Sequence, residues 1–257
     1  MNFSADQIMT WTLSVIWPFM RITAMLFVSP IFGARNVNAQ MRMGLALLLA
    51  MLIAPQLPAA PLIDPLSMQG LMVAMQQVVI GIAMGFSLQM VFSALTQAGE
   101  SVALSMGLGF ASAIDPVGGI QVPIVAQFFV IIATLLFLAM NGHLVLIEML
   151  MLSFVSLPIS EAGLRSDDFW ALLNFGTTMF SGALLIALPA IASQLVVNLS
   201  MGVVARTAPQ MNIFAVGFPV MMMAGFILLS VLLPSIFARL GELLTQGFEL
   251  IQQLIRL

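Results

Sequence analysis

The chain has 257 residues, of which 61% are hydrophobic and only 7% are charged. Soluble domains carry about a quarter charged residues, so this chain lacks the polar side chains needed to cover a soluble surface. With a mean hydropathy of +1.14, the composition excludes a soluble globule, a disordered chain and a coiled coil, and it indicates a polytopic membrane protein.

Missing residue types exclude several kinds of site. The chain has no lysine, which a P-loop requires, and no cysteine for disulfides, thiolate nucleophiles or sulfur-ligated metals. Its single histidine, His143, cannot build a histidine metal cluster. The net charge of -3 comes without any basic run, so nucleic acid is not an expected partner. We expect no enzymatic activity, no metal and no cofactor.

Six long apolar stretches divide the chain into candidate helices. They cover residues 8–32, 43–57, 66–97, 123–157, 169–204 and 213–240. After them, residues 241–257 are expected to form a helix that carries a few charged residues along its length. No basic residue lies among the first twenty, so we expect an uncleaved first span rather than a signal peptide. The loop arginines are almost evenly divided between the two sides of the membrane. They only slightly favour an orientation with both chain ends outside the cytoplasm.

The stretches differ from plain membrane spans in their length. A span needs about 20 residues, and 66–97 and 169–204 are much longer. Within 123–157, Asn141-Gly142-His143 is a strong turn signal that predicts two half-length helices. Such a break is tolerated only where protein buries the freed backbone. We therefore predict an all-α membrane protein whose helices are held largely by other protein rather than by lipid.

Small or polar residues recur at every fourth position of the third stretch. The row comprises Gln77, Gly81, Gly85, Gln89, Ser93, Gln97 and Ser101. Its Gly81-x-x-x-Gly85 pair allows two helix backbones to approach closely. Since a four-residue step drifts against the 3.6-residue period, the row winds around the helix. It indicates ordinary helix packing or, alternatively, a face that meets several partners or a wet lumen.

Four ionisable side chains are candidates for burial: Arg21, Glu100, Asp115 and Glu148. Charges inside membranes are expensive and usually face protein or water. We expect Arg21 to pair with a carboxylate, either Glu100 or Glu148. A proton relay is poorly supported, because His143 and Glu148 are not spaced to share a helix face. The 22 methionines fill apolar gaps, although a few could form a deformable seal.

The segment 105–121 is apolar but rich in glycine. Its candidate residues are Gly107, Leu108, Gly109, Phe110, Ile114, Asp115, Pro116, Gly118 and Gly119. Glycine and proline disfavour a continuous helix, so the segment is either a buried connector or an element across a constriction. We favour the second interpretation, in which an apolar plug seals a channel by excluding water.

A short polar turn separates the last two long stretches. It contains Arg206, Pro209, Gln210 and Asn212, and Pro209 cannot continue the preceding helix. The turn is either a plain solvated loop or a contact with partner proteins.

Four motifs carry a resemblance to a known family. They are Gly107-x-Gly109-Phe110, Asp115-Pro116-x-Gly118-Gly119, Asn141-Gly142-His143 and the segment 205–219. In this order they resemble the FliR family of flagellar biosynthetic proteins, which includes an injectisome counterpart. The resemblance covers essentially the whole chain.

The resemblance implies a subunit of the type III protein export gate in the bacterial inner membrane, at the flagellar basal body. Members of the family assemble with FliP-like and FliQ-like subunits into a multi-subunit helical stack, an FlhB-like subunit joins at the cytoplasmic side, and unfolded substrates pass through the centre. It further implies that residues 1–168 are FliP-like and residues 169–257 form a FliQ-like hairpin. The turn 205–212 would then lie at the cytoplasmic face.

Three other functions stay open at this point. An injectisome export-gate subunit would carry the same motifs. A secondary transporter would need a polar midplane site and an internal inverted repeat, and we find no repeat. A purely structural assembly scaffold would use the same helices as a gate.

Overall fold

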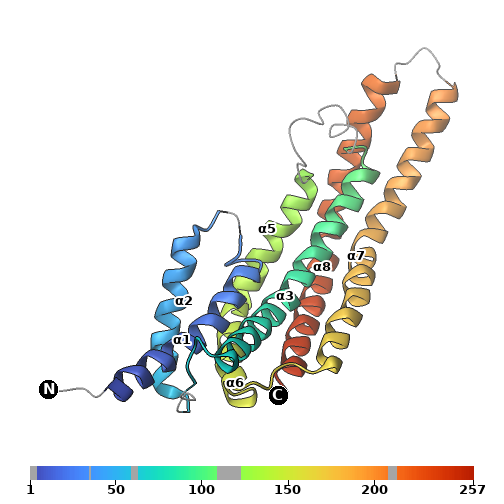
Figure 1. The fold of residues 1–257 in the computed structure, drawn as a ribbon. Helices are drawn as coiled ribbons and strands as arrows, with labels where there is room; N and C mark the ends of the chain where they lie inside the picture. Colours follow the sequence, from blue (N-terminus) through green and yellow to red (C-terminus); the bar gives the residue numbers. More distant parts are fainter. Residues whose placement is uncertain (1–4, 35, 59–62, 109–122, 208–212) are drawn as a thin grey trace. The chain divides into compact units, whose positions relative to one another are not determined.

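The computed structural model describes residues 5–34, 36–58, 63–108, 123–207 and 213–257 (Figure 1). Its elements are α1 (Ala5–Val28), α2 (Ala39–Ile53), the short 3-10 helix η1 (Ala54–Gln56), α3 (Met68–Ser105), α5 (Ile124–Ala139), α6 (Gly142–Ser156), α7 (Ser166–Thr207) and α8 (Ile213–Leu254). All regular structure in these ranges is helical, which confirms the predicted all-α class.

Local capping explains where several helices begin. The Asn38 side chain accepts a hydrogen bond from the Gln40 amide at the start of α2. The Ser67 hydroxyl accepts one from the Gly70 amide at the start of α3. At α7, the Asp168 carboxylate accepts a 2.7 Å hydrogen bond from the Arg165 amide. Each cap satisfies an amide that the first helical turn leaves without a partner.

The predicted break in the fourth apolar stretch is confirmed. Asn141 adopts a left-handed conformation, with φ 57°, between α5 and α6. Asparagine tolerates this conformation better than most residues, so the Asn-Gly pair ends one helix and starts the next. Neither α5, with 16 residues, nor α6, with 15, reaches the length of an ordinary membrane span.

The number of apolar helices also agrees with the expectation. In the described part of the chain, five helices are long and apolar enough to cross a membrane, and the α5–α6 pair counts as a sixth, broken span. The last two stretches are longer than predicted, because α7 and α8 each contain 42 residues. The predicted tail helix is the uninterrupted continuation of α8.

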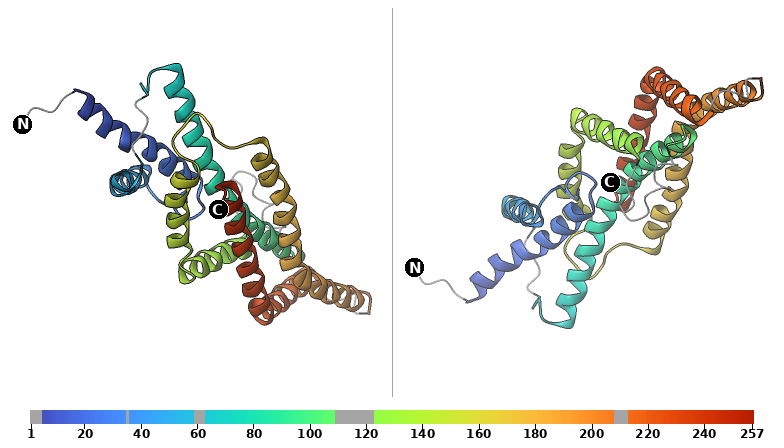
Figure 2. Two further views of the ribbon diagram at one scale, coloured as in Figure 1. Left: turned by 90° about the horizontal axis from the view of Figure 1, so that it is seen from below. Right: turned by 90° about the horizontal axis from the view of Figure 1, so that it is seen from above.

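The chain forms two compact units, each assembled from separated segments. The first contains residues 1–90, 140–176 and 245–257, and the second contains residues 91–139 and 177–244. In the second unit α7 and α8 are antiparallel neighbours, with Gly182 beside Leu243 and the Gln194 side chain bonded to the Met221 carbonyl (Figures 1 and 2). The predicted division at residue 168 follows sequence likeness and stays a prediction.

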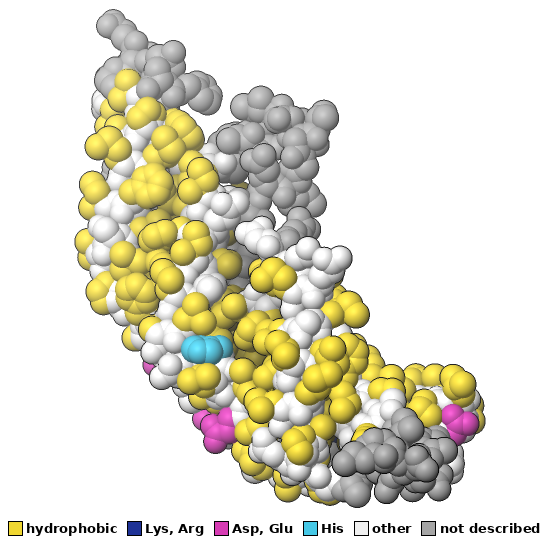
Figure 3. All heavy atoms as spheres, turned by 90° about the vertical axis from the view of Figure 1, so that its left-hand side faces the viewer, with side chains coloured by type: hydrophobic (Ala, Val, Ile, Leu, Met, Phe, Trp, Pro, Cys, Tyr) yellow, Lys and Arg dark blue, Asp and Glu magenta, His cyan; other side chains and the backbone are white. Residues whose placement is uncertain are grey.

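Much of the apolar surface has no covering within the chain. Figure 3 shows one face on which hydrophobic side chains predominate and carboxylates are few. On α2 only the stripe of Ala46, Ala50 and Ile53 is buried, while Leu48 and Leu52 are exposed. Exposed patches of this extent mark contacts with lipid or with other proteins.

Candidate functional site

Arg21 lies at the centre of the first unit, where α1, α3 and α6 meet. Its side chain is fully buried. Its Nε donates to the Gln77 Oε1 atom at 2.9 Å, and its Nη1 donates to the carbonyl and hydroxyl oxygens of Ser153 at 2.8 and 3.0 Å. Its Nη2 donates to the Leu157 carbonyl at 2.8 Å, and the guanidinium stacks on the Phe154 ring, 4.2 Å from the centroid.

These contacts make Arg21 a C-terminal cap for α6. The Ser153 carbonyl accepts the last helical hydrogen bond from the Leu157 amide and a second one from Arg21, while the Leu157 carbonyl lies beyond that last bond and needs a donor from elsewhere. A cation at this end also interacts favourably with the helix dipole. Because Gln77 belongs to α3, one guanidinium joins three helices that are distant in sequence.

The expected ion pair of Arg21 with Glu100 or Glu148 is wrong. Neutral oxygens and an aromatic ring surround the guanidinium, and Arg21 makes no ion pair within the described ranges. Among the burial candidates that the structure describes, Arg21 is buried, Glu100 is half-buried and Glu148 is exposed, while Asp115 lies outside the described residues. The physical reason is that two carbonyls at the end of α6, the Ser153 hydroxyl and an amide oxygen supply the acceptors that a carboxylate would have offered.

The first part of the four-residue row forms a seam between α1 and α3. A Cβ atom on Gly81 would collide with the Arg21 carbonyl oxygen, and one on Gly85 would lie 2.7 Å from the Met25 carbonyl oxygen. Arg21 faces Gly81 and Met25, four residues on, faces Gly85, so the two helices run parallel here with matching four-residue steps. Such a close backbone approach is what the packing interpretation of the glycine pair predicts.

The rest of the row departs from that seam. Gln77 is fully buried, whereas Gln89 and Ser93 are half-buried and Gln97 is exposed. The increase in exposure agrees with the predicted winding of a four-residue row around the helix.

The second unit holds a polar cluster that the sequence did not single out. The amide nitrogens of Gln194 and Asn198, one turn apart on α7, donate to the carbonyls of Met221 and Ser105 at 3.0 and 3.3 Å. Gly107 follows α3 with φ 82°, a left-handed conformation that favours glycine. The cluster joins α7, α8 and the end of α3 just before the glycine-rich segment.

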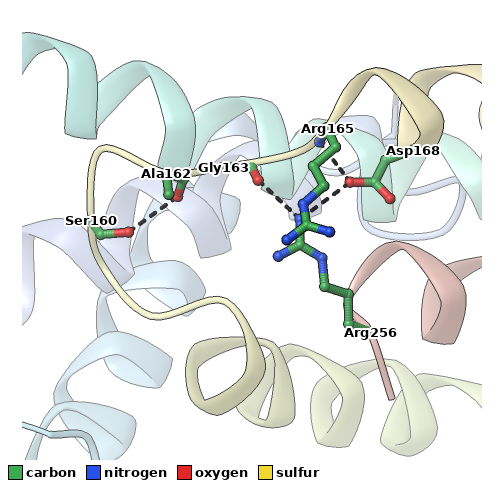
Figure 4. Close-up of polar contacts among 6 residues, drawn as sticks. All are labelled: Ser160, Ala162, Gly163, Arg165, Asp168 and Arg256. Atoms are coloured by element: carbon green, nitrogen blue, oxygen red, sulfur yellow. Dashed lines mark hydrogen bonds and ion pairs between the residues drawn. The ribbon is translucent and has the colours of Figure 1, made fainter.

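A further contact missed by the sequence lies at the start of α7 (Figure 4). The Arg256 guanidinium lies 3.6 Å from the Asp168 carboxylate and donates to the Gly163 carbonyl at 3.3 Å. Arg256 adopts a left-handed conformation, with φ 60°, two residues beyond the end of α8. The contact joins the residues that follow α8 to the first turn of α7, and no sequence spacing predicts it.

Comparison with known proteins now identifies the family. The family model described as bacterial export proteins, family 1, matches residues 12–247. The chain is 38% identical over 257 residues to the flagellar biosynthetic protein FliR of Pectobacterium carotovorum, covering 99% of this chain and 97% of that protein. It is also 38% identical to FliR of Escherichia coli K12, with the same coverage, and 31% identical to FliR of Bacillus subtilis, covering 93% of each. The chain belongs to the FliR family.

Membership in the FliR family makes this chain a multi-pass membrane component of the flagellar export apparatus, which has several subunits. The matched region includes the glycine-rich segment and the polar turn on which the resemblance was based. The relatives compared above are flagellar proteins, in agreement with the flagellar alternative.

Two candidate sites of this FliR family member lie largely outside the described residues. The plug candidates Gly109, Phe110, Ile114, Asp115, Pro116, Gly118 and Gly119, and the turn candidates Pro209, Gln210 and Asn212, belong to this group. Of the remaining candidates, Gly107 and Leu108 follow α3, and Arg206 is exposed in the last turn of α7. Their proposed roles stay predictions.

Proposed function

We propose that the chain helps to form and seal the channel through which unfolded flagellar proteins cross the bacterial inner membrane. In this proposal FliP-like and FliQ-like subunits complete the channel wall, and an FlhB-like subunit joins at the cytoplasmic side. Residues 1–168 take the FliP-like position and residues 169–257 the FliQ-like position. Family membership supports the export role, and sequence likeness supports the choice of partners.

One observation carries the proposal. The 42 residues of α8 amount to about 63 Å of helix at a rise of about 1.5 Å per residue, roughly twice the thickness of a hydrocarbon core. Only 17% of its apolar stretch is buried within the chain. A helix that is too long for the bilayer and still apolar on its outside needs protein neighbours, as a subunit of a helical stack has.

We further propose that residues 107–120 plug the channel. An apolar constriction blocks water and ions by dewetting. The glycines provide hinges, Phe110 provides bulk, and Leu108 and Ile114 add apolar surface. Asp115 would fix the turn before Pro116 by accepting backbone hydrogen bonds. The left-handed Gly107 supports a sharp change of direction at the start of this segment.

The turn that contains Arg206, Pro209, Gln210 and Asn212 is proposed to contact partners at the cytoplasmic entrance. The exposed Arg206 at the end of α7 supports this, because a charge between two apolar helices prefers an aqueous face. A crosslinker at Gln210 should capture cytoplasmic-side subunits. Crosslinks to periplasmic proteins alone would contradict the placement.

The experiment that tests the channel is deletion of residues 111–117 in cells that express the whole apparatus. We expect the complex to assemble and the membrane to leak small ions. Assembly without a leak, or loss of assembly without a leak, would favour the scaffold. Solute uptake by the purified chain alone would favour the transporter.

A further inference from the structure

Helix α6 carries one charged residue in the middle of its exposed face. The exposed residues of α6 are Leu144, Glu148, Met151, Leu152 and Val155, and we call this set the α6 stripe. The members Leu144, Glu148, Met151 and Val155 follow each other at intervals of four, three and four residues. This is the spacing of a helix–helix seam.

The opposite face of α6 is fixed inside the first unit. Leu146, Leu150 and Phe154 are buried, and the Arg21 guanidinium binds the Ser153 and Leu157 carbonyls. The helix therefore cannot rotate to hide Glu148 without breaking the buried Arg21 contacts. Its orientation on α1 and α3 presents the α6 stripe outward.

Neither lipid nor bulk water suits this face. An unpaired carboxylate is costly against hydrocarbon, and Glu148 has no ion-pair partner among residues that the structure describes. Water would solvate Glu148, but it would leave Val155, 70% exposed, and Leu144, 55% exposed, uncovered on the same stripe. A protein surface that is apolar and carries one positive charge would satisfy both requirements.

We infer that the α6 stripe is a docking seam for a helix of another subunit, and that this helix places one arginine or lysine opposite Glu148. The apolar members supply buried area, and the ion pair fixes the register of the two helices, as single polar residues do in coiled-coil seams. The inference rests on the proposed assembly, because it needs a neighbouring subunit.

Substitutions at Glu148 separate the possible occupants of the seam. Glu148→Leu would leave the partner's cation buried and unpaired, and we expect on the order of a 100-fold loss of complex or more. Glu148→Gln, which keeps a hydrogen-bond acceptor, should lose much less. Glu161→Leu is the matched control, since Glu161 is an exposed carboxylate in the linker before α7, and it should leave the complex unchanged.

The decisive experiment is charge exchange in the intact apparatus. Glu148→Arg should abolish complex formation and motility, and replacing one basic residue of a neighbouring subunit with glutamate should restore both. Because the chain has no cysteine, Glu148→Cys also provides a unique thiol, which should form a disulfide with a cysteine at that partner position. Restoration together with this crosslink establishes the seam.

Other results overturn the inference in distinguishable ways. If neither Glu148→Leu nor Glu148→Arg changes the amount of complex formed, no cation faces the α6 stripe. Labelling of the Glu148→Cys variant by a membrane-impermeant maleimide in the assembled complex would mean that the stripe lines water. If the unmodified chain fails to co-purify with any neighbouring subunit, the proposed function itself is wrong.

Discussion

A Cβ atom on Gly85 of α3 would lie 2.7 Å from the Met25 carbonyl oxygen of α1. This is closer than a carbon and an oxygen can approach without strain, and the obstructing atom belongs to a helix backbone that cannot rotate away. The parallel seam between α1 and α3 therefore depends on the absence of a side chain at this position.

We predict that Gly85→Ala destabilises the chain by about 1–3 kcal/mol, because the two helices must separate to admit the methyl group. Gly44→Ala in α2 is the control, since a Cβ there meets nothing within 4 Å. Replacing a helical glycine without a clash stabilises by about 0.5–1 kcal/mol. Thermal unfolding of the purified complex, followed by circular dichroism, measures both. Equal effects of the two substitutions would show that the seam is not tight.

A second prediction concerns the buried guanidinium. Arg21→Met should destabilise the protein by about 3 kcal/mol, because the Leu157 carbonyl and the amide oxygen of Gln77 lose their donor and the Ser153 carbonyl keeps only the Leu157 amide. Arg21→Lys should also destabilise, by about 1–3 kcal/mol, because one ammonium cannot reproduce the planar fork of a guanidinium.

The control for Arg21 is Arg239→Met. Arg239 pairs with Glu242 at 2.8 Å, and both side chains are more than half exposed. Exposed pairs contribute about 0–1 kcal/mol, so the midpoint of unfolding should hardly move. If Arg21→Met were as stable as the parent chain, apolar packing alone would hold α1, α3 and α6 together, and the hydrogen bonds of Arg21 would be dispensable.

A third prediction concerns the contact of Arg256 with Asp168. The two groups are 3.6 Å apart and partly accessible, with 35% and 12% of their side chains exposed. Arg256→Ala should therefore cost less than about 1 kcal/mol, and the difference should shrink as salt is added. Unfolding at low and high salt measures it. A large loss that salt does not alter would indicate that the Gly163 hydrogen bond dominates instead.

The sequence predicted the elements far better than the contacts between them. The lengths of the apolar stretches predicted the helices, and the Asn-Gly pair predicted the break at Asn141. The four-residue spacing of Gly81 and Gly85 indicated a close approach of two helices. Composition alone could not say what faces Arg21, because helix-end carbonyls are acceptors in every sequence and leave no residue type to recognise. The expectation of an ion pair failed for that reason.

Contacts between segments that are distant in the chain could not be predicted from the sequence either. The whole of α7 and α8 separates Arg256 from the linker that it contacts at Gly163. Nothing in the spacing of charges selects Asp168 over Asp167. The same holds for Gln194 and Asn198, which look like ordinary polar interruptions of an apolar helix. Burial on α7 distinguishes Gln194, and burial depends on packing that the sequence does not display.

The last prediction is that Gln194→Leu leaves the stability of the second unit unchanged or raises it by up to about 1 kcal/mol. Gln194 is 1% exposed, and its nitrogen donates to the Met221 carbonyl. That bond fixes the amide orientation and leaves the Oε1 atom buried without a partner. Met221 lies inside α8, where its carbonyl can also accept a helical hydrogen bond. Leucine removes the unpaired oxygen while nearly conserving the side-chain volume, so the free energy lost with the hydrogen bond and the free energy gained by removing the buried Oε1 should almost cancel.

Unfolding of the complex that carries Gln194→Leu, compared with the complex that carries Gln194→Ala, measures this, because alanine adds a cavity and should destabilise by about 1–3 kcal/mol. A strong loss for leucine as well would mean that Oε1 has a partner in the assembled apparatus.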